Sequence, residues 1–100
     1  MTISKEKNGK ELRIIPVGRL DTESAPSLES EIKSTPDDIT ELVLDFSKLD
    51  YISSAGLRVL LNAHNNMDER GGKMTVKSAT KGILEVFEIT GFIDILHIEI

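Results

Sequence analysis

The first seventeen residues form two strand-like segments separated by a turn signal. Ile3–Lys7 alternates weakly between apolar and polar side chains, and Glu11–Val17 reads as the return strand. Asn8-Gly9 lies between them, and Asn-Gly between extended segments favours a type I′ turn, in which both central residues have positive φ. The pattern therefore predicts an antiparallel β-hairpin. Pro16 has no N–H to donate, so we expect it at a bulge or on an unpaired side of its strand.

A helical pattern follows the hairpin. Asp21 or Thr22 can cap a helix whose first turn carries Glu23, and Pro26 is tolerated only near a helix start. Spacings of three and four residues predict one inward face, made of Ala25, Leu28 and Ile32. The polar segment Ser34–Asp38 then ends the helix as a loop.

The middle of the chain predicts a buried strand and a second helix. Ile39–Phe46 reads as a strand, and Leu42–Leu44 is apolar on both faces, which suits a central strand. Tyr51–Ile52 is a short extended piece. A helix is expected over Ser54–Glu69, ended by Gly71–Gly72. Its apolar stripe consists of Leu57, Leu60, Leu61, His64 and Met67.

The last third repeats the alternation of strand and helix. Lys73–Lys77 predicts a strand, and Thr80–Ile89 predicts a helix closed by Gly91. The inward positions of this helix are Ile83, Val86, Phe87 and Ile89. Phe92–Ile95 fits one more helical turn, and Leu96–Ile100 fits a final strand.

The resulting order is β-β-α-β-α-β-α-β, which places the chain in the α/β class. Strands that alternate with helices imply parallel crossovers, whereas the opening hairpin adds one antiparallel pair. We therefore expect a single mixed β-sheet with helices packed mainly on one face. A length of 100 residues fits one domain over residues 1–100.

Composition narrows the function classes. The net charge is −5 and the twelve basic residues are scattered, which disfavours nucleic acid, because its binding needs clustered Lys and Arg. The absence of cysteine excludes disulfides and Cys-based metal or redox sites. No segment fits a membrane span or a secretion signal, so we expect a cytoplasmic protein, monomeric in solution and without contact to a membrane.

The sequence contains no enzyme constellation, so we expect no catalytic residue, cofactor or metal. His64 and His97 lie far apart in sequence, and each reads as a packed or surface histidine. Asp37 and Asp38 read as solvated loop carboxylates, since no partner groups stand at metal-site spacing.

The small residues Ser53–Gly56, at the start of the second predicted helix, allow two interpretations. In the first, Ser53 or Ser54 caps the helix and Ala55-Gly56 packs against a neighbour. In the second, another surface approaches the backbone here, because Gly56 in a helix costs roughly 1 kcal/mol relative to Ala. A hydroxyl at a helix N-terminus is also a reasonable phosphoacceptor, because free N–H groups and the helix dipole stabilise a phosphate there.

The chain resembles the STAS domains of bacterial anti-sigma factor antagonists. The resemblance is carried by L-V-L-D-F-S-K-L-D-Y-I-S-S-A-G-L-R-V-L-L at Leu42–Leu61 and by G-R-L-D-T-E-S-A at Gly18–Ala25. The segments G-G-K-M-T-V and E-I-T-G-F-I-D-I-L are similar to the family too. The match spans nearly the whole chain and implies the STAS fold.

The resemblance implies a partner switch. An unphosphorylated antagonist of this family binds an anti-sigma factor that is also a serine kinase of the histidine-kinase-like ATPase type, which frees the sigma factor. Phosphorylation of a serine at the start of the second helix, here Ser54, releases the antagonist, and a PP2C-type phosphatase reverses the mark. Asp21 matches the family's Asp beside that serine, and Gly56 and Arg58 would lie on the docking surface with Ser53 and Ala55.

One position departs from the family pattern, and two other functions stay open. Many antagonists carry Asp directly before the acceptor, where this chain has Ser53, so the phosphate could move to Ser53.

The first alternative function is a non-phosphorylated STAS scaffold or sensor module in a larger signalling complex. The second is a small-ligand or nucleotide-binding domain, for which Gly71–Gly72 is weak evidence.

Overall fold

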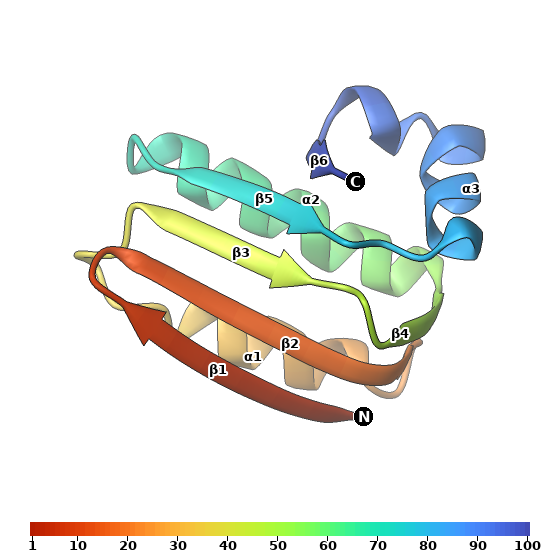
Figure 1. Cartoon of the computed structure of the whole chain (residues 1–100), viewed down its shortest axis with the longest axis horizontal. Coiled ribbons are helices and arrows are strands. Elements are labelled where there is room, and N and C mark those ends of the chain that lie inside the picture. The colour runs from red at the N-terminus through yellow and green to blue at the C-terminus, as the bar shows by residue number, and fades with distance from the viewer.

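A computed structural model describes all of residues 1–100. It contains six strands, three α-helices and a short 3₁₀ helix (Figure 1). The strands are β1 (Thr2–Asn8), β2 (Glu11–Leu20), β3 (Glu41–Asp45), β4 (Leu49–Ile52), β5 (Lys73–Lys77) and β6 (His97–Glu99). The helices are α1 (Ala25–Lys33), α2 (Ser54–Glu69), α3 (Lys81–Thr90) and the 3₁₀ helix η1 (Phe92–Asp94). None of them is long and apolar enough to cross a membrane.

The strands form one mixed sheet in the order β1-β2-β3-β5-β6. Only the β1–β2 pair is antiparallel, and β2–β3, β3–β5 and β5–β6 are parallel. The short strand β4 pairs in parallel with the end of β2, beyond the part of β2 that pairs with β3. The predicted fold class, a single mixed sheet opened by a hairpin, is therefore confirmed.

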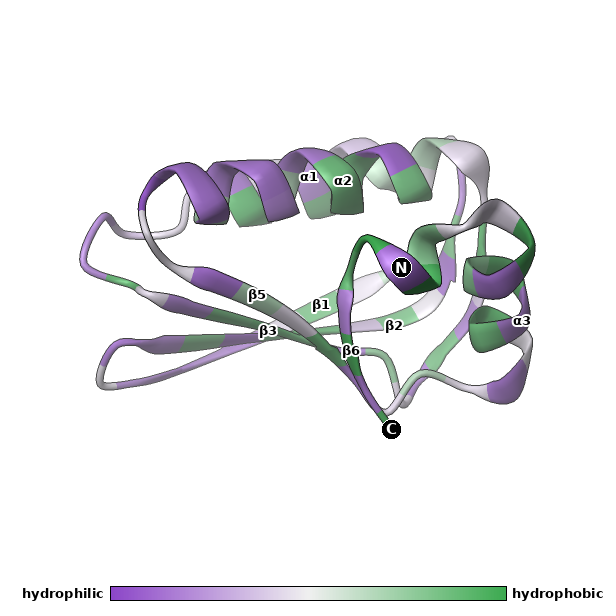
Figure 2. Ribbon diagram, turned by 90° about the horizontal axis from the view of Figure 1, so that it is seen from above, coloured by the Kyte–Doolittle hydropathy of each residue, from purple (hydrophilic) through white to green (hydrophobic).

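One face of the sheet carries the core. Neighbouring strands place apolar residues in register on this face, in the rows Leu12–Leu42–Met74 and Ile14–Leu44–Val76. All six side chains are buried and belong to one cluster of 22 residues. Helices α1 and α2 cover this face (Figure 2), and α1 contributes the three buried residues that its spacing predicted, Ala25, Leu28 and Ile32.

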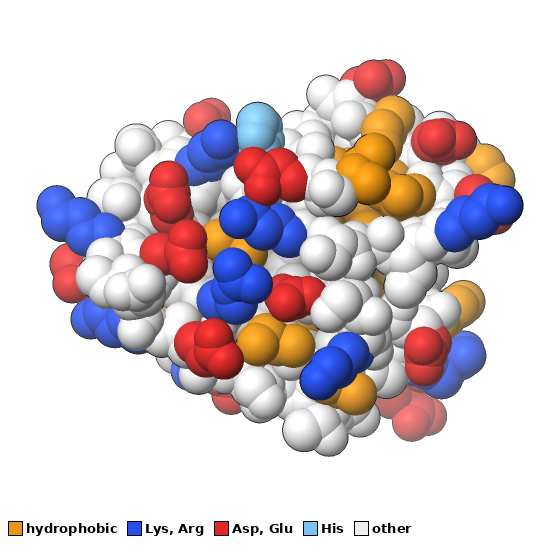
Figure 3. Space-filling model, viewed as in Figure 1, with side chains coloured by type: hydrophobic (Ala, Val, Ile, Leu, Met, Phe, Trp, Pro, Cys, Tyr) orange, Lys and Arg blue, Asp and Glu red, His pale blue; other side chains and the backbone are white.

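The opposite face of the sheet is mostly polar, with a few apolar side chains among the charged ones (Figure 3). Figure 3 shows basic and acidic side chains interspersed across it. On this face Arg13 Nη1 lies 3.5 Å from Asp45 Oδ2, and Lys77 Nζ lies 3.5 Å from Glu99 Oε2. Val43 points to this side from the centre of β3 and is only 3% exposed. The apolar run of β3 thus fills both sides of a central strand, as predicted.

Helix α3 and η1 lie at one end of the sheet, and α3 packs against β4 (Figure 1). Ile83 and Phe87 of α3 are buried, as expected from their spacing of four. The inward placement of Ile89 was wrong, because its side chain is 87% exposed. Ile89 follows Phe87 by two residues, about 200° around the helix, and therefore faces the opposite way.

The backbone corrects one local prediction and agrees with another. The hairpin loop is Gly9-Lys10, since Asn8 pairs with Glu11, and only Gly9 has positive φ (+64°). A single positive φ at the first loop position belongs to a type II′ turn, so the type I′ prediction was wrong. Pro16 lies, as expected, where β2 lacks a partner on one side, between the residues paired with β3 and those paired with β4.

Candidate functional site

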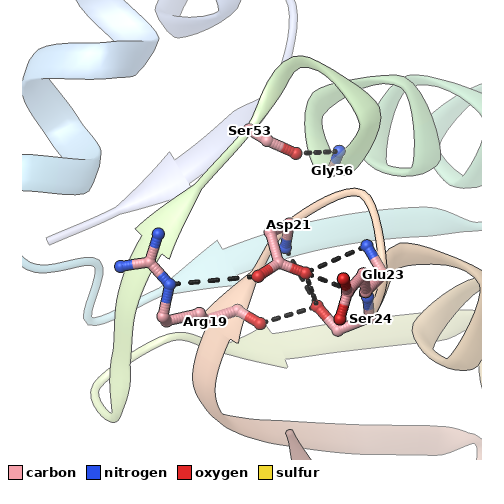
Figure 4. A network of polar contacts seen from close by, with 6 residues as sticks. All are labelled: Arg19, Asp21, Glu23, Ser24, Ser53 and Gly56. Atoms are coloured by element: carbon pink, nitrogen blue, oxygen red, sulfur yellow. Dashed lines mark hydrogen bonds and ion pairs between the residues drawn. The ribbon is translucent and has the colours of Figure 1, made fainter.

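The candidate site is built where two neighbouring parallel strands end. β2 and β4 stop at Leu20 and Ile52, which are partners in the sheet. The N–H of Ser53 donates to the carbonyl of Leu20 at 2.9 Å and ties the two chain segments together. The loop that starts at Asp21 and the N-terminus of α2 therefore lie side by side (Figure 4). Crevices at the carboxyl ends of parallel strands are the usual binding positions of α/β sheets.

Asp21 organises the first of these loops. Its Oδ1 accepts hydrogen bonds from the N–H groups of Glu23 and Ser24, each at 3.0 Å, and the N–H of Asp21 donates to Ser24 Oγ at 2.9 Å. This reciprocal pair is a capping box, and it starts the turn that leads into α1 (Figure 4). The capping role predicted for Asp21 or Thr22 thus falls to Asp21, although the regular helix begins later, at Ala25.

The carboxylate of Asp21 is held in its charged form. The N–H of Ser24 is the largest cause that keeps the pKa of Asp21 below its usual value, and partial desolvation opposes it. The Ser24 hydroxyl, the Glu23 N–H and the charge of Arg19 also lower the pKa. Asp21 therefore places a fixed negative charge in this loop at neutral pH.

Arg19 and Tyr51 lie beside this loop on adjacent strands. The Arg19 guanidinium lies 4.2 Å from the centre of the Tyr51 ring, and its Nε lies 3.9 Å from Asp21 Oδ2. The sequence analysis did not single out Arg19, Ser24 or Tyr51. Arg19 and Tyr51 become neighbours only through the β2–β4 pairing, which no local pattern indicates. The D-x-x-S spacing of a capping box could have identified Ser24.

The two serines before Ala55 have different environments. Ser53 is the N-cap of α2, with extended backbone (φ −97°, ψ 175°), and its Oγ accepts the N–H of Gly56 at 3.3 Å. Ser54 is the first residue of the helix, and its side chain is exposed and makes no hydrogen bond. The capping interpretation therefore applies to Ser53, and Ser54 has a free hydroxyl.

Gly56 packs closely against side chains of this chain rather than leaving room for a partner protein. A Cβ at Gly56 would lie 2.7 Å from Leu20 Cγ and 2.9 Å from Ile52 Cγ1. Atoms of these types do not approach within 3.0 Å, so the glycine lets α2 pack directly on the ends of β2 and β4. Of the two interpretations of this glycine, packing against a neighbour accounts for it without a second surface.

Ala55 and Arg58 lie on the outer side of the first two turns of α2. Both line a shallow cavity of about 150 Å³ between α1 and α2, with Thr22 and Glu29 on its other side. Ala55 is half-buried and Arg58 is exposed. The structure thus brings all the predicted site residues to one end of the molecule, with only Gly56 buried.

The two histidines, which are distant in sequence, line one small cavity of about 140 Å³ with Asp68. His64 Nδ1 is buried there without a hydrogen-bond partner. No group of three His, Cys, Asp or Glu side chains is arranged to hold a metal ion.

Comparisons with known proteins agree with this architecture. The STAS domain family matches residues 2–99. BtrV of Bordetella bronchiseptica, named as a candidate anti-sigma factor antagonist, is 37% identical over 82 residues, 81% of this chain and 71% of BtrV. The anti-sigma-B factor antagonist of Bacillus subtilis is 22% identical over 98% of this chain and 90% of its own length.

Among solved structures, the anti-sigma factor antagonist SpoIIAA in its unphosphorylated form superposes with a TM-score of 0.78. The match covers 99% of this chain and 88% of SpoIIAA at 15% identity, which establishes a shared fold. The family match over almost every residue, together with these antagonist relatives, shows that this chain belongs to the STAS domain family.

Proposed function

We propose that this protein is an anti-sigma factor antagonist whose binding to an anti-sigma factor is controlled by phosphorylation of Ser54. The observation that carries the proposal is the division of roles between the two serines. Ser53 uses its Oγ to cap α2, whereas the exposed Ser54 hydroxyl is unbonded at the helix N-terminus. SpoIIAA, which has the same fold, has been solved in a phosphorylated and an unphosphorylated form.

The partner is an anti-sigma factor that is also a serine kinase of the histidine-kinase-like ATPase type. In the forward step the Ser54 Oγ attacks the γ-phosphorus of ATP, the bond to the bridging oxygen breaks, and ADP leaves. The hydroxyl proton passes to a base of the kinase. A PP2C-type phosphatase hydrolyses the phosphoserine with water and restores the hydroxyl, and both reactions take place in the cytoplasm.

The switch works through charge. Phosphorylation adds about −1.5 to −2 charge at neutral pH. The new charge appears beside the loop of Asp21, whose carboxylate is held in its charged form by Ser24 and Glu23. A close protein interface would have to desolvate this dianion, and about 3 kcal/mol lost in this way weakens binding roughly a hundredfold.

The test uses the purified protein, ATP, magnesium and each candidate histidine-kinase-like anti-sigma factor from the same genome, with intact mass as the readout. We expect one phosphate to be added to wild type and to Ser53→Ala but not to Ser54→Ala. Loss of the phosphate in Ser53→Ala alone would move the acceptor to Ser53. No phosphate with any candidate would favour the scaffold or sensor alternative.

A second test separates the charge mechanism from the identity of the acceptor. Ser54→Asp places a permanent carboxylate at the helix start, and we expect it to weaken binding to the kinase partner at least tenfold. Ser54→Ala should bind about as tightly as wild type. Wild-type affinity of Ser54→Asp would refute the electrostatic account even if Ser54 were the acceptor.

A further inference from the structure

Arg58 is the one arginine of this chain without a partner. Arg13 lies 3.5 Å from Asp45, and Arg19 contacts both Asp21 and the Tyr51 ring. Arg70 donates to the carbonyls of Pro36 and Ile39 at 3.0 and 3.4 Å. Arg58 is exposed and makes no hydrogen bond or ion pair. Its guanidinium is therefore available to an anion at no cost in existing contacts.

Arg58 lies one helical turn after Ser54 on α2. The two residues are four apart, so their side chains lie on the same face of the helix, one turn from each other. Side chains of a helix tilt toward its N-terminus, so a long side chain at position 58 can reach a group on Ser54. An anion N-terminal to a cation at this spacing is the favourable orientation of a helical ion pair.

We propose that Arg58 binds the phosphate of phosphorylated Ser54 within the same helix. The proposal rests on Ser54 being the residue that is modified. Phosphoserine presents three acceptor oxygens, and the planar guanidinium can donate to two of them at once. The unpaired N–H groups at the start of α2 face the same phosphate and add to its binding.

This internal pair gives the switch a second component. In the unmodified protein Arg58 is exposed at the cavity between α1 and α2 and can contact a partner there. In the modified protein the guanidinium is turned to the phosphate. Phosphorylation therefore adds a negative charge to the surface and at the same time withdraws a positive one.

The other arginine near this end of α2 is already occupied. The Arg19 guanidinium already contacts the Tyr51 ring and the Asp21 carboxylate, so part of its binding capacity is in use. Arg58 gives up no contact. The structure therefore assigns the phosphate to Arg58 rather than to Arg19.

The experiment uses full-length protein with phosphoserine encoded at position 54, so that no kinase is needed. Titration followed by ³¹P NMR at low salt gives the pKa of the second phosphate ionisation in wild type, Arg58→Gln, Arg58→Lys and Lys10→Gln. Lys10 lies in the β1–β2 loop, at the far end of the sheet, and controls for the loss of one positive charge (Figure 1).

We expect the phosphate of Arg58→Gln to titrate a few tenths of a pH unit higher than that of wild type. Arg58→Lys should restore part of the difference and Lys10→Gln should behave as wild type. The Arg58 Nε–H signal should also shift between unmodified and phosphorylated wild type. Equal pKa values in wild type and Arg58→Gln would overturn the proposal. A failure of every kinase to modify Ser54 would instead refute the proposed function and leave this titration unchanged.

Discussion

Replacing Gly56 by alanine tests whether this glycine serves the fold or a partner. The added methyl group would lie 2.7 Å from Leu20 Cγ and 2.9 Å from Ile52 Cγ1. Leu20 is completely buried and Ile52 is 3% exposed, so neither can move into solvent. We therefore expect Gly56→Ala to destabilise the free protein, without any partner present.

The magnitude follows from two opposing effects. Carbon atoms in contact are normally about 3.5 to 4.0 Å apart, so the two side chains or the helix must shift by about 1 Å. Overpacking of this kind costs about 1 to 3 kcal/mol. Alanine regains at most about 1 kcal/mol of helix propensity. The net loss should be roughly 1 to 2 kcal/mol, which lowers the Tm of a domain of this size by about 5 to 15 °C.

The assay is urea denaturation followed by circular dichroism, with Gly82→Ala as the matched control. Gly82 also lies in a helix, α3, but a Cβ there meets nothing within 4 Å. Gly82→Ala should therefore stabilise the protein by up to about 1 kcal/mol. Leu20→Ala combined with Gly56→Ala should cost less than the sum of the single variants. A Gly56→Ala protein as stable as wild type would refute the packing argument and return the glycine to a role at a partner surface.

Three further predictions concern the same end of the molecule and α3. In urea denaturation Ser53→Ala should lose about 0.5 to 1.5 kcal/mol through the missing cap, whereas Ser53→Asp and Ser54→Ala should stay within about 0.5 kcal/mol of wild type. The pKa of Asp21 is lowered in the folded state. The ionised Asp21 carboxylate therefore stabilises the fold above the pKa of the unfolded chain, and this stabilisation is lost as the pH falls through the pKa of the folded state. Asp21→Asn should therefore lose less stability between pH 6 and pH 3 than wild type, and an equal loss would contradict this. Ile89→Ser should change the free energy of unfolding by less than about 0.5 kcal/mol, because the side chain is 87% exposed, and a loss above 1 kcal/mol would show that Ile89 packs against the fold.

Features decided by local chemistry were predictable from the sequence. The extent of α2, about Ser54 to Glu69, was predicted closely, because serines suited to capping stand at its start and Gly71–Gly72 follows its end. The central strand β3 was recognised from its apolar run, and the end of α3 from Gly91, which adopts the left-handed conformation (φ +81°). Each of these signals acts over a few residues and needs no tertiary contact.

Features decided by tertiary contacts were not predictable in the same way. Nothing in the residues of β4 indicates that it pairs with the end of β2, yet this pairing brings Arg19 onto Tyr51 and places the Asp21 loop beside α2. The sequence predicted that Gly56 could pack against a neighbour, but it did not indicate which residue this would be, because Leu20 lies far from Gly56 in sequence. The sequence located the candidate residues, and the pairing of the two strand ends determines how they are arranged.

Ser53 performs the helix-capping role that an aspartate at the same position could also perform. Resemblance to the antagonists places Asp at the position of Ser53, and the structure makes that position the N-cap of α2. Asp and Ser are among the strongest N-cap residues because each presents an oxygen to the free N–H groups of the first turn. The exchange therefore preserves the start of the helix and the exposure of Ser54, while it removes one negative charge beside the proposed acceptor. In the proposed switch, a phosphate on Ser54 is therefore repelled by one charge fewer, and Arg58 is the cation that we propose to pair with it.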